Sequence, residues 1–159
     1  MLKSLFCGCS FGSPAPSNNP ALNPLKSPPP TKAKESVQFV PPITEGDVIN
    51  VYDGDTITIV SKLPYDASPL YRFSVRLAGI DTAEIKGKTE RERELAQEAK
   101  FALQKLILNK VVVLKNVKNE KYGRVLADVY LGDLHVNQWL LDNKYAVKYS
   151  GGTKPTDWV

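Results

Sequence analysis

Cysteine and histidine are almost absent from this sequence. Its 159 residues contain two cysteines and one histidine, and both cysteines, Cys7 and Cys9, lie within the first ten residues. The rest of the chain has no thiol, so a disulfide framework is excluded there. Metal sites built from cysteine and histidine are excluded in practice as well, because His135 is the sole remaining ligand of that kind.

Long apolar runs and a strongly charged folded part are also missing. No stretch approaches the roughly 18 uncharged apolar residues that a membrane-spanning helix needs. An apolar share of 42% predicts a soluble globular protein, and the length suits one domain with its own core. The formal net charge is +4, but residues 1–42 carry +3 of it, from four lysines against one glutamate. The pI near 9.0 is therefore weak evidence that the folded part binds polyanions.

Proline dominates the N-terminal segment, because nine of the 12 prolines lie within residues 1–42. Such a composition cannot bury enough apolar surface to offset the conformational entropy lost on ordering. We predict a disordered Pro/Ser-rich tail or tether over 1–42, a folded domain over 43–150 and a loose C-terminus over 151–159.

The first ten residues, MLKSLFCGCS, leave the location of the protein open. The apolar run at Leu5 and Phe6 is too short for a secretory signal, which favours an intracellular location. Acylation of Cys7 and Cys9 would tether the chain to a membrane; alternatively, both are reduced cysteines in a flexible tail. The lack of acidic residues before Glu35 is typical of an organelle transit peptide, whereas the lack of arginine argues against one.

Alternation of apolar and polar residues predicts the strands of the folded part. A turn at Asp53-Gly54 joins the first two strands, and a turn over 118–123 joins the last two. The five expected strands cover residues 47–52, 56–60, 71–80, 111–114 and 125–131.

Two helices complete the expected fold. Thr89 and Glu92 have the spacing of a capping box, and a second, short helix is expected over 136–142. A helix after the third of five strands is the layout of an OB fold. We therefore expect a mainly β domain of the α+β class, an OB-fold barrel with a short C-terminal helix. The apolar stripe of the first helix comprises Leu95, Ala99, Ala102, Leu103 and Leu106.

Charged residues gather at two turns and at the end of the third strand. Most have an ordinary explanation when taken singly, since Asp-Gly is a common hairpin pair and a strand arginine is usually solvated. Asp55 is harder to explain, because aspartate is disfavoured at the head of a strand. The residues are Asp53, Asp55, Arg76, Asp81, Glu84 and Arg124.

Taken together, these residue types suit the hydrolysis of a phosphodiester. The reaction needs positive charge or hydrogen-bond donors on the phosphate oxygens and a positioned water. Aspartates supply the hard oxygen ligands that Ca²⁺ and Mg²⁺ prefer. Arginines supply planar forks for phosphate, and a glutamate can orient or deprotonate the water.

Three motifs, YDGDTITI, RLAGIDTAE and KYGRVLADVY, occur in this order. They closely resemble the staphylococcal nuclease (thermonuclease) family over residues 45–150. The resemblance implies that Asp55, Asp81 and the backbone carbonyl of Thr82 bind Ca²⁺, with Asp53 close to the metal through water.

The same resemblance implies the residues that handle the substrate. Arg76 and Arg124 would hold the scissile phosphate, and Glu84 would act on the attacking water. The substrate-binding residues implied in this way are Lys121, Tyr122 and Tyr149.

The chain departs from the family at Ala83, where proline is usual. An alanine there leaves the backbone before Glu84 less restricted. The segment 61–71 is also longer than in the shortest members, and the long third helix of the bacterial enzyme has no counterpart after Tyr149.

We therefore expect a Ca²⁺-dependent hydrolase, an endonuclease or exonuclease of the thermonuclease type. It would act as a monomer on DNA and RNA, with little sequence specificity. The alternative is a non-catalytic OB-fold module that binds nucleic acid or protein, because OB folds often bind without chemistry. Retention of the whole charged set favours the enzyme.

Overall fold

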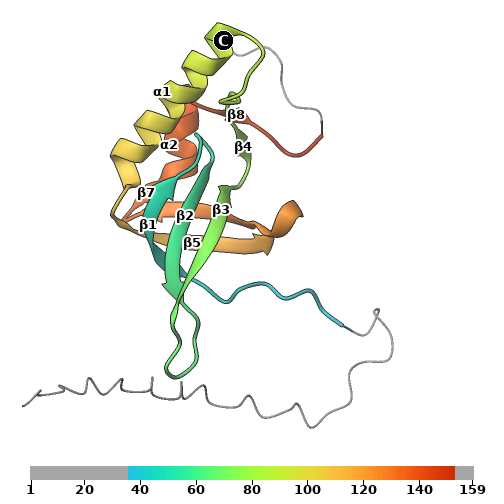
Figure 1. Ribbon diagram of the computed structural model, residues 1–159, viewed down its shortest axis with the longest axis vertical. Helices are drawn as coiled ribbons and strands as arrows, with labels where there is room; N and C mark the ends of the chain where they lie inside the picture. Colours follow the sequence, from blue (N-terminus) through green and yellow to red (C-terminus); the bar gives the residue numbers. More distant parts are fainter. Residues whose placement is uncertain (1–35, 153–159) are drawn as a thin grey trace, which may run out of the picture. The chain divides into compact units, whose positions relative to one another are not determined.

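The computed structural model describes residues 36–152 (Figure 1). The elements below belong to the unit Gln38–Val159. The predicted tail with Cys7 and Cys9 lies almost wholly outside the described residues, and so does the C-terminus from residue 153. Within 36–152, no helix has the length and apolar character needed to cross a membrane.

A closed barrel of five strands forms the centre of the domain. The strands pair antiparallel in the order β3-β2-β1-β5-β6, and a parallel pair between β3 and β6 closes the barrel. The predicted OB-type barrel is confirmed. Its strands are β1 (Glu45–Val51), β2 (Thr56–Lys62), β3 (Leu70–Leu77), β5 (Val111–Asn119) and β6 (Val125–Leu131).

The third strand is shorter than its alternating pattern predicts. The pattern extends over 71–80, but β3 ends at Leu77 and a turn precedes the short strand β4 (Ile80–Asp81). Gly79 in that turn has a φ of +75°, a conformation that residues with side chains rarely adopt. The glycine thus ends the strand and lets β4 pair with a separate strand, β8 (Val147–Lys148), which places Asp81 opposite Val147.

Both predicted helices are present. Helix α1 (Glu90–Ile107) begins after Thr89, whose hydroxyl accepts a hydrogen bond from the backbone N–H of Glu92 at 3.1 Å. Helix α2 (Val136–Asp142) has the predicted bounds. In Figure 1, the two helices, β4 and β8 lie around the upper end of the barrel. The buried face of α1 comprises Ala96, Ala99, Leu103 and Ile107, whereas Leu95, Ala102 and Leu106 of the predicted stripe are half-buried.

Aliphatic side chains from the strands and both helices fill the core. Burying one of them fully contributes about 1.5–3 kcal/mol. Val75 and Leu77 are both fully buried, so their packing fixes the register of β3 and with it the position of Arg76 between them. Other fully buried members are Ile57, Ile59, Leu103, Ile107, Val112, Val129 and Leu140.

The remaining elements are short. Residues 121–123 form a 3-10 turn, η2 (Lys121–Gly123), between β5 and β6, where the sequence predicts a turn. A two-residue strand, β7 (Leu134–His135), pairs with β6 just before α2.

Candidate functional site

Arg76 joins two aspartates at the centre of a buried charged cluster. Its Nη1 lies 2.7 Å from Asp55 Oδ1, and its Nη2 lies 2.6 Å from Asp81 Oδ1. The exposed fractions are 9% for Arg76, 2% for Asp55 and 0% for Asp81, so the three charges lie away from bulk solvent. A solvated strand arginine, the ordinary expectation for such a position, is therefore excluded for Arg76.

Strand pairing and one turn bring these three residues together. The register of β2 and β3 places Thr56 opposite Arg76, so Asp55, just before the first residue of β2, lies beside the guanidinium. The turn that contains Gly79 then directs β4 so that Asp81 contacts the same arginine from five residues further along the chain.

The turn before β2 is shaped by hydrogen bonding and by close packing. Asp53 Oδ1 accepts a hydrogen bond from the backbone N–H of Asp55 at 3.1 Å, which stabilises the turn. A Cβ at Gly54 would lie 2.9 Å from both Ala99 Cβ and Thr82 Cγ2. Only glycine therefore allows the turn to approach α1 and the residue after Asp81 this closely.

Asp55 also connects the turn to Thr82. Its Oδ1 accepts a hydrogen bond from Thr56 Oγ1 at 2.9 Å, besides the one from Arg76. Its Oδ2 accepts a hydrogen bond from the backbone N–H of Thr82 at 3.3 Å. The structure thus brings together Asp55, Asp81 and Thr82, the three residues implied as cation ligands.

Burial and neighbouring charges shift pKa values within the cluster. Burial, the largest cause, and the charge of Asp53 raise the pKa of Asp55 to about 7, although the charge of Arg76 opposes the rise. Burial lowers the pKa of Arg76, but the carboxylates of Asp55 and Asp81 outweigh that effect and raise it. Carboxylates that are buried and repel one another favour the arrival of another cation.

The ligand set fits a hard cation such as Ca²⁺ or Mg²⁺. Among residues 36–152, no group of three or more His, Cys, Asp or Glu side chains is arranged to hold a metal. A cation at the cluster would therefore have the two carboxylates of Asp55 and Asp81, with the remaining ligands from backbone carbonyls and water. Hard cations accept such all-oxygen sets, in which water supplies several ligands.

Arg124, the second predicted arginine, lies on the same face of the sheet as Arg76. Arg76 pairs with Leu126 across the parallel β3–β6 pair, and Arg124 stands two residues before Leu126. The hydrogen bond to Glu120 is the main factor that raises the pKa of Arg124. Burial opposes that rise. The charge of Arg76 lowers the pKa of Arg124 slightly and that of Asp55 raises it slightly, so Arg124 interacts electrostatically with the cluster.

Glu120 is a residue of this region that the sequence analysis does not identify. Its carboxylate accepts hydrogen bonds from Arg124 Nε at 2.7 Å and from Arg124 Nη2 at 2.9 Å. In the sequence, only the spacing of four residues between Glu120 and Arg124 indicates this contact. Opposite charges with that spacing are common, so the signal is weak.

The other predicted residues lie outside the five barrel strands. Glu84 is exposed in the loop between β4 and α1, three residues after Asp81. Lys121 and Tyr122 are exposed in η2, and Tyr122 is 92% exposed. The hydroxyl of Tyr149 donates a hydrogen bond to the carbonyl of Gly152 at 2.9 Å. Tyr149 lines a cavity of about 570 Å³ with His135 and Asn137, rather than with the charged cluster. The roles of these four residues stay predictions.

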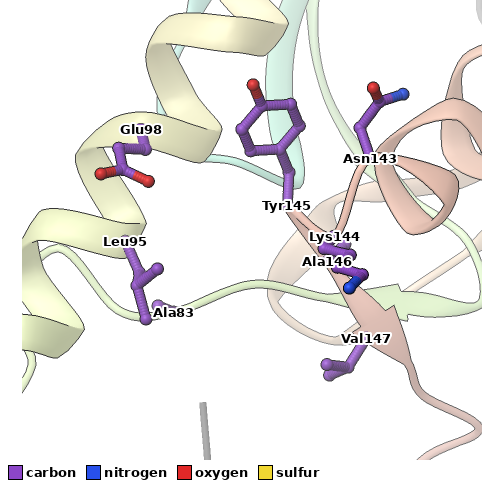
Figure 2. A pocket seen from close by; sticks show the side chains of 8 residues that line it. All are labelled: Ala83, Leu95, Glu98, Asn143, Lys144, Tyr145, Ala146 and Val147. Carbon is purple, nitrogen blue, oxygen red and sulfur yellow. The ribbon is translucent and has the colours of Figure 1, made fainter. Parts of the chain in front are cut away.

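Ala83 connects the cluster to α1. It is 4% exposed and lies between Thr82 and Glu84. Figure 2 shows Ala83 beside Leu95 of α1, in a cavity of about 440 Å³ that residues 143–147 also line. The loop that carries Thr82 and Glu84 therefore lies against the helix, with space beside the alanine.

Comparison with known proteins gives a match over much of the same region. A family model described as "Staphylococcal nuclease homologue" matches residues 74–157. The match includes Arg76, Asp81, Glu84 and Arg124, whereas Asp55 lies before it. In the structure, Asp55 nevertheless belongs to the same cluster as the matched residues, because it contacts Arg76 directly.

Curated proteins of two bacteria are also similar to this chain. An uncharacterized protein of Bacillus anthracis is 31% identical over 106 residues, which are 65% of this chain and 46% of the relative. An "Uncharacterized endonuclease" of Escherichia coli is 29% identical over 97 residues, which are 60% of this chain and 55% of the relative. The chain thus spans about half the length of the curated relatives it matches.

Proposed function

This chain belongs to the staphylococcal nuclease family, and from that membership we propose that it is a Ca²⁺-dependent nuclease. It would hydrolyse the phosphodiester bonds of DNA and RNA with little sequence specificity. The family resemblance predicted from the three motifs is confirmed. The name "endonuclease" belongs to the Escherichia coli relatives, and it supports cleavage within the strand here.

The buried contact of Arg76 with Asp55 and Asp81 is the observation that carries the proposal. Charges removed from water are costly, and well-packed apolar residues often stabilise a fold as well as a buried ion pair does. A third carboxylate nearby, that of Asp53, adds repulsion. Stability alone does not explain such a cluster, whereas a site that combines a cation and a phosphate does.

Asp55, Asp81 and the backbone carbonyl of Thr82 would hold the Ca²⁺. When bound, Ca²⁺ supplies a Lewis acid that withdraws charge from the phosphate oxygens. Arg76 would turn from the carboxylates toward the phosphate, once their charge is compensated. Asp53 would keep the turn of Asp55 in place through the hydrogen bond that it already makes.

The two arginines and Glu84 would act on the substrate itself. Arg76 and Arg124 would donate hydrogen bonds to the non-bridging oxygens and stabilise the charge that gathers there in the transition state. Glu84 would accept a proton from the attacking water, and its exposed position leaves it accessible to both water and substrate.

Low sequence specificity follows from contacts of this kind, because phosphate groups carry no base information. Lys121 and Tyr122 are exposed next to Arg124 in the chain, where a cation and an aromatic ring suit an unpaired strand. We therefore expect single-stranded or frayed substrates to be cleaved faster than intact duplex.

The test is a cleavage assay of the full chain on single-stranded DNA, duplex DNA and RNA, with Ca²⁺, with Mg²⁺ and with a chelator. The proposal predicts degradation of all three nucleic acids in Ca²⁺ and none in chelator. Folded protein that binds nucleic acid but cleaves none of them in either metal would contradict the nuclease and favour a binding module.

A further inference from the structure

The side chain of Glu120 holds the guanidinium of Arg124 by two parallel hydrogen bonds. Arg124 Nε lies 2.7 Å from Glu120 Oε2, and Nη2 lies 2.9 Å from Oε1. The exposed fractions are 29% for the arginine side chain and 20% for the glutamate side chain, so both are shielded. A bidentate contact between a guanidinium and a carboxylate fixes the plane and the direction of the arginine.

This geometry determines which donors remain for a substrate. A guanidinium has five N–H donors, and Glu120 engages its Nε–Nη2 edge. The Nη1 group lies on the opposite edge and remains for a second anion. A phosphate at that edge would meet an arginine already held in one orientation.

The same glutamate closes the loop that precedes Arg124. The backbone N–H of Glu120 donates a hydrogen bond to the carbonyl of Arg124 at 2.9 Å. Between them, Tyr122 has a φ of +66°, which is unfavourable for a residue with a side chain. Such a conformation persists only where the surrounding structure holds it. Glu120 therefore fixes the end of η2 through its side chain and its backbone.

The loop that Glu120 closes leads directly into Arg124, which interacts electrostatically with Arg76 and Asp55. The parallel β3–β6 pair places Arg76 opposite Leu126, and Arg124 lies on the same face two residues earlier. A change in the loop would alter the angle between the two arginines without touching the buried contacts of Arg76.

We propose that Glu120 is a positioning residue for the arginine that binds the scissile phosphate. This inference rests on the proposed nuclease function. Glu120 acts through Arg124: it restricts the rotamers of that side chain before the substrate arrives and directs Nη1 toward the phosphate. Its contribution is to the orientation of a transition-state contact, so its loss lowers kcat more than it raises KM.

If Glu120 acted through its charge alone, its removal would change KM and not kcat. Glu120 compensates part of the charge of Arg124, so its removal would strengthen attraction of the substrate. In that case KM would fall and kcat would stay the same. The two parameters therefore separate positioning from simple charge compensation.

The experiment measures kcat and KM of the full chain on single-stranded DNA in Ca²⁺ for Glu120→Gln, Glu120→Ala and Glu120→Asp. Glu94→Gln is the matched control, because it removes the same charge from an exposed ion pair with Arg91. Circular dichroism and Tm verify that each variant is folded. Should Glu120→Ala fail to fold, Glu120→Gln keeps the size of the side chain and retains the test.

Positioning predicts a fall in kcat of about 10- to 100-fold for Glu120→Gln and Glu120→Ala, with KM changed by about twofold or less. Glu120→Asp keeps the carboxylate and should lie between these variants and the parent. The double variant Glu120→Ala, Arg124→Ala should be no slower than Arg124→Ala, because both changes remove the same contact.

An unchanged kcat in a folded Glu120 variant would overturn the inference and leave the nuclease proposal intact. Additive losses in the double variant would overturn it too, since they would show a role independent of Arg124. An inactive parent would contradict the nuclease proposal itself, and the inference with it.

Discussion

Replacement of Arg76 by methionine removes the guanidinium that contacts both buried carboxylates and keeps most of the apolar side chain. Arg76 lies 2.7 Å from Asp55 Oδ1 and 2.6 Å from Asp81 Oδ1, and the carboxylate side chains are 3% and 0% exposed. Removal of one partner from a buried ion pair costs about 3–5 kcal/mol. For a fold of this size, the corresponding fall in Tm is about 10 to 20 °C.

Added Ca²⁺ should reverse part of this loss, because the cation supplies positive charge to the same carboxylates. Arg76 competes with the cation for Asp55 and Asp81, so Arg76→Met should bind Ca²⁺ more tightly than the parent does. A tenfold gain in affinity would stabilise the variant by about 1.4 kcal/mol more than the parent at saturating Ca²⁺.

The assay is thermal unfolding of the full chain in chelator and across a Ca²⁺ titration. Arg91→Met is the control, since Arg91 makes an exposed contact with Glu94 at 3.4 Å that should contribute little. An unchanged Tm in chelator would refute the energetic argument. Equal Ca²⁺-induced shifts in parent and Arg76→Met would refute competition between the arginine and the cation.

Three further substitutions test other parts of the site. Gly54→Ala places a methyl group 2.9 Å from Ala99 Cβ and Thr82 Cγ2. It should lower stability by about 1–3 kcal/mol in denaturant unfolding and reduce cleavage; parent-like values for both would contradict the packing argument. Ala83→Pro restores the usual family residue beside a cavity of about 440 Å³. It should raise stability by about 0.4–1 kcal/mol, and a lower Tm would mean that this loop cannot accept proline. Glu84→Gln should lower kcat by about 10²- to 10⁴-fold, because the role proposed for this exposed carboxylate is to accept a proton from the attacking water; a normal kcat would remove Glu84 from the mechanism.

Local signals predict the helices and most strands of this fold. Thr89 and Glu92 identify the start of α1 because the capping contact lies within four residues. The buried face of α1 is less predictable, since Ala96 and Ile107 are buried where the stripe favours Leu95 and Leu106. Which neighbouring residues face the core depends on how the helix is placed on the barrel, and periodicity alone does not contain that information.

The end of β3 is a second feature that the alternating pattern does not predict. Alternation continues through 71–80, yet the chain turns at Gly79, and this turn is what brings Asp81 to Arg76. Pairing of the short strands β4 and β8 is a long-range contact and leaves no local signal. The family resemblance predicts the grouping of Asp55, Arg76 and Asp81, whereas residue spacing alone leaves each with an ordinary explanation.

Two features of the site depend on geometry that the sequence does not display. The sequence predicts Gly54 only as part of a hairpin turn. The structure shows in addition that its close packing against Ala99 and Thr82 leaves no room for a side chain. The contact between Glu120 and Arg124 depends on a loop in which Tyr122 adopts a positive φ. Neither the conformation of that loop nor the direction of the glutamate follows from the four-residue spacing.

We propose that Asp55 and Asp81 form the cation site of a nuclease. The most direct test of this proposal is the initial rate of single-stranded DNA cleavage in Ca²⁺ by Asp55→Asn and Asp81→Asn, with Asp66→Asn in the exposed β2–β3 loop as control. Both site variants should lose at least about 10²-fold in rate while folded, and the control should cleave like the parent. Parent-like cleavage by folded Asp55→Asn and Asp81→Asn would contradict the proposal.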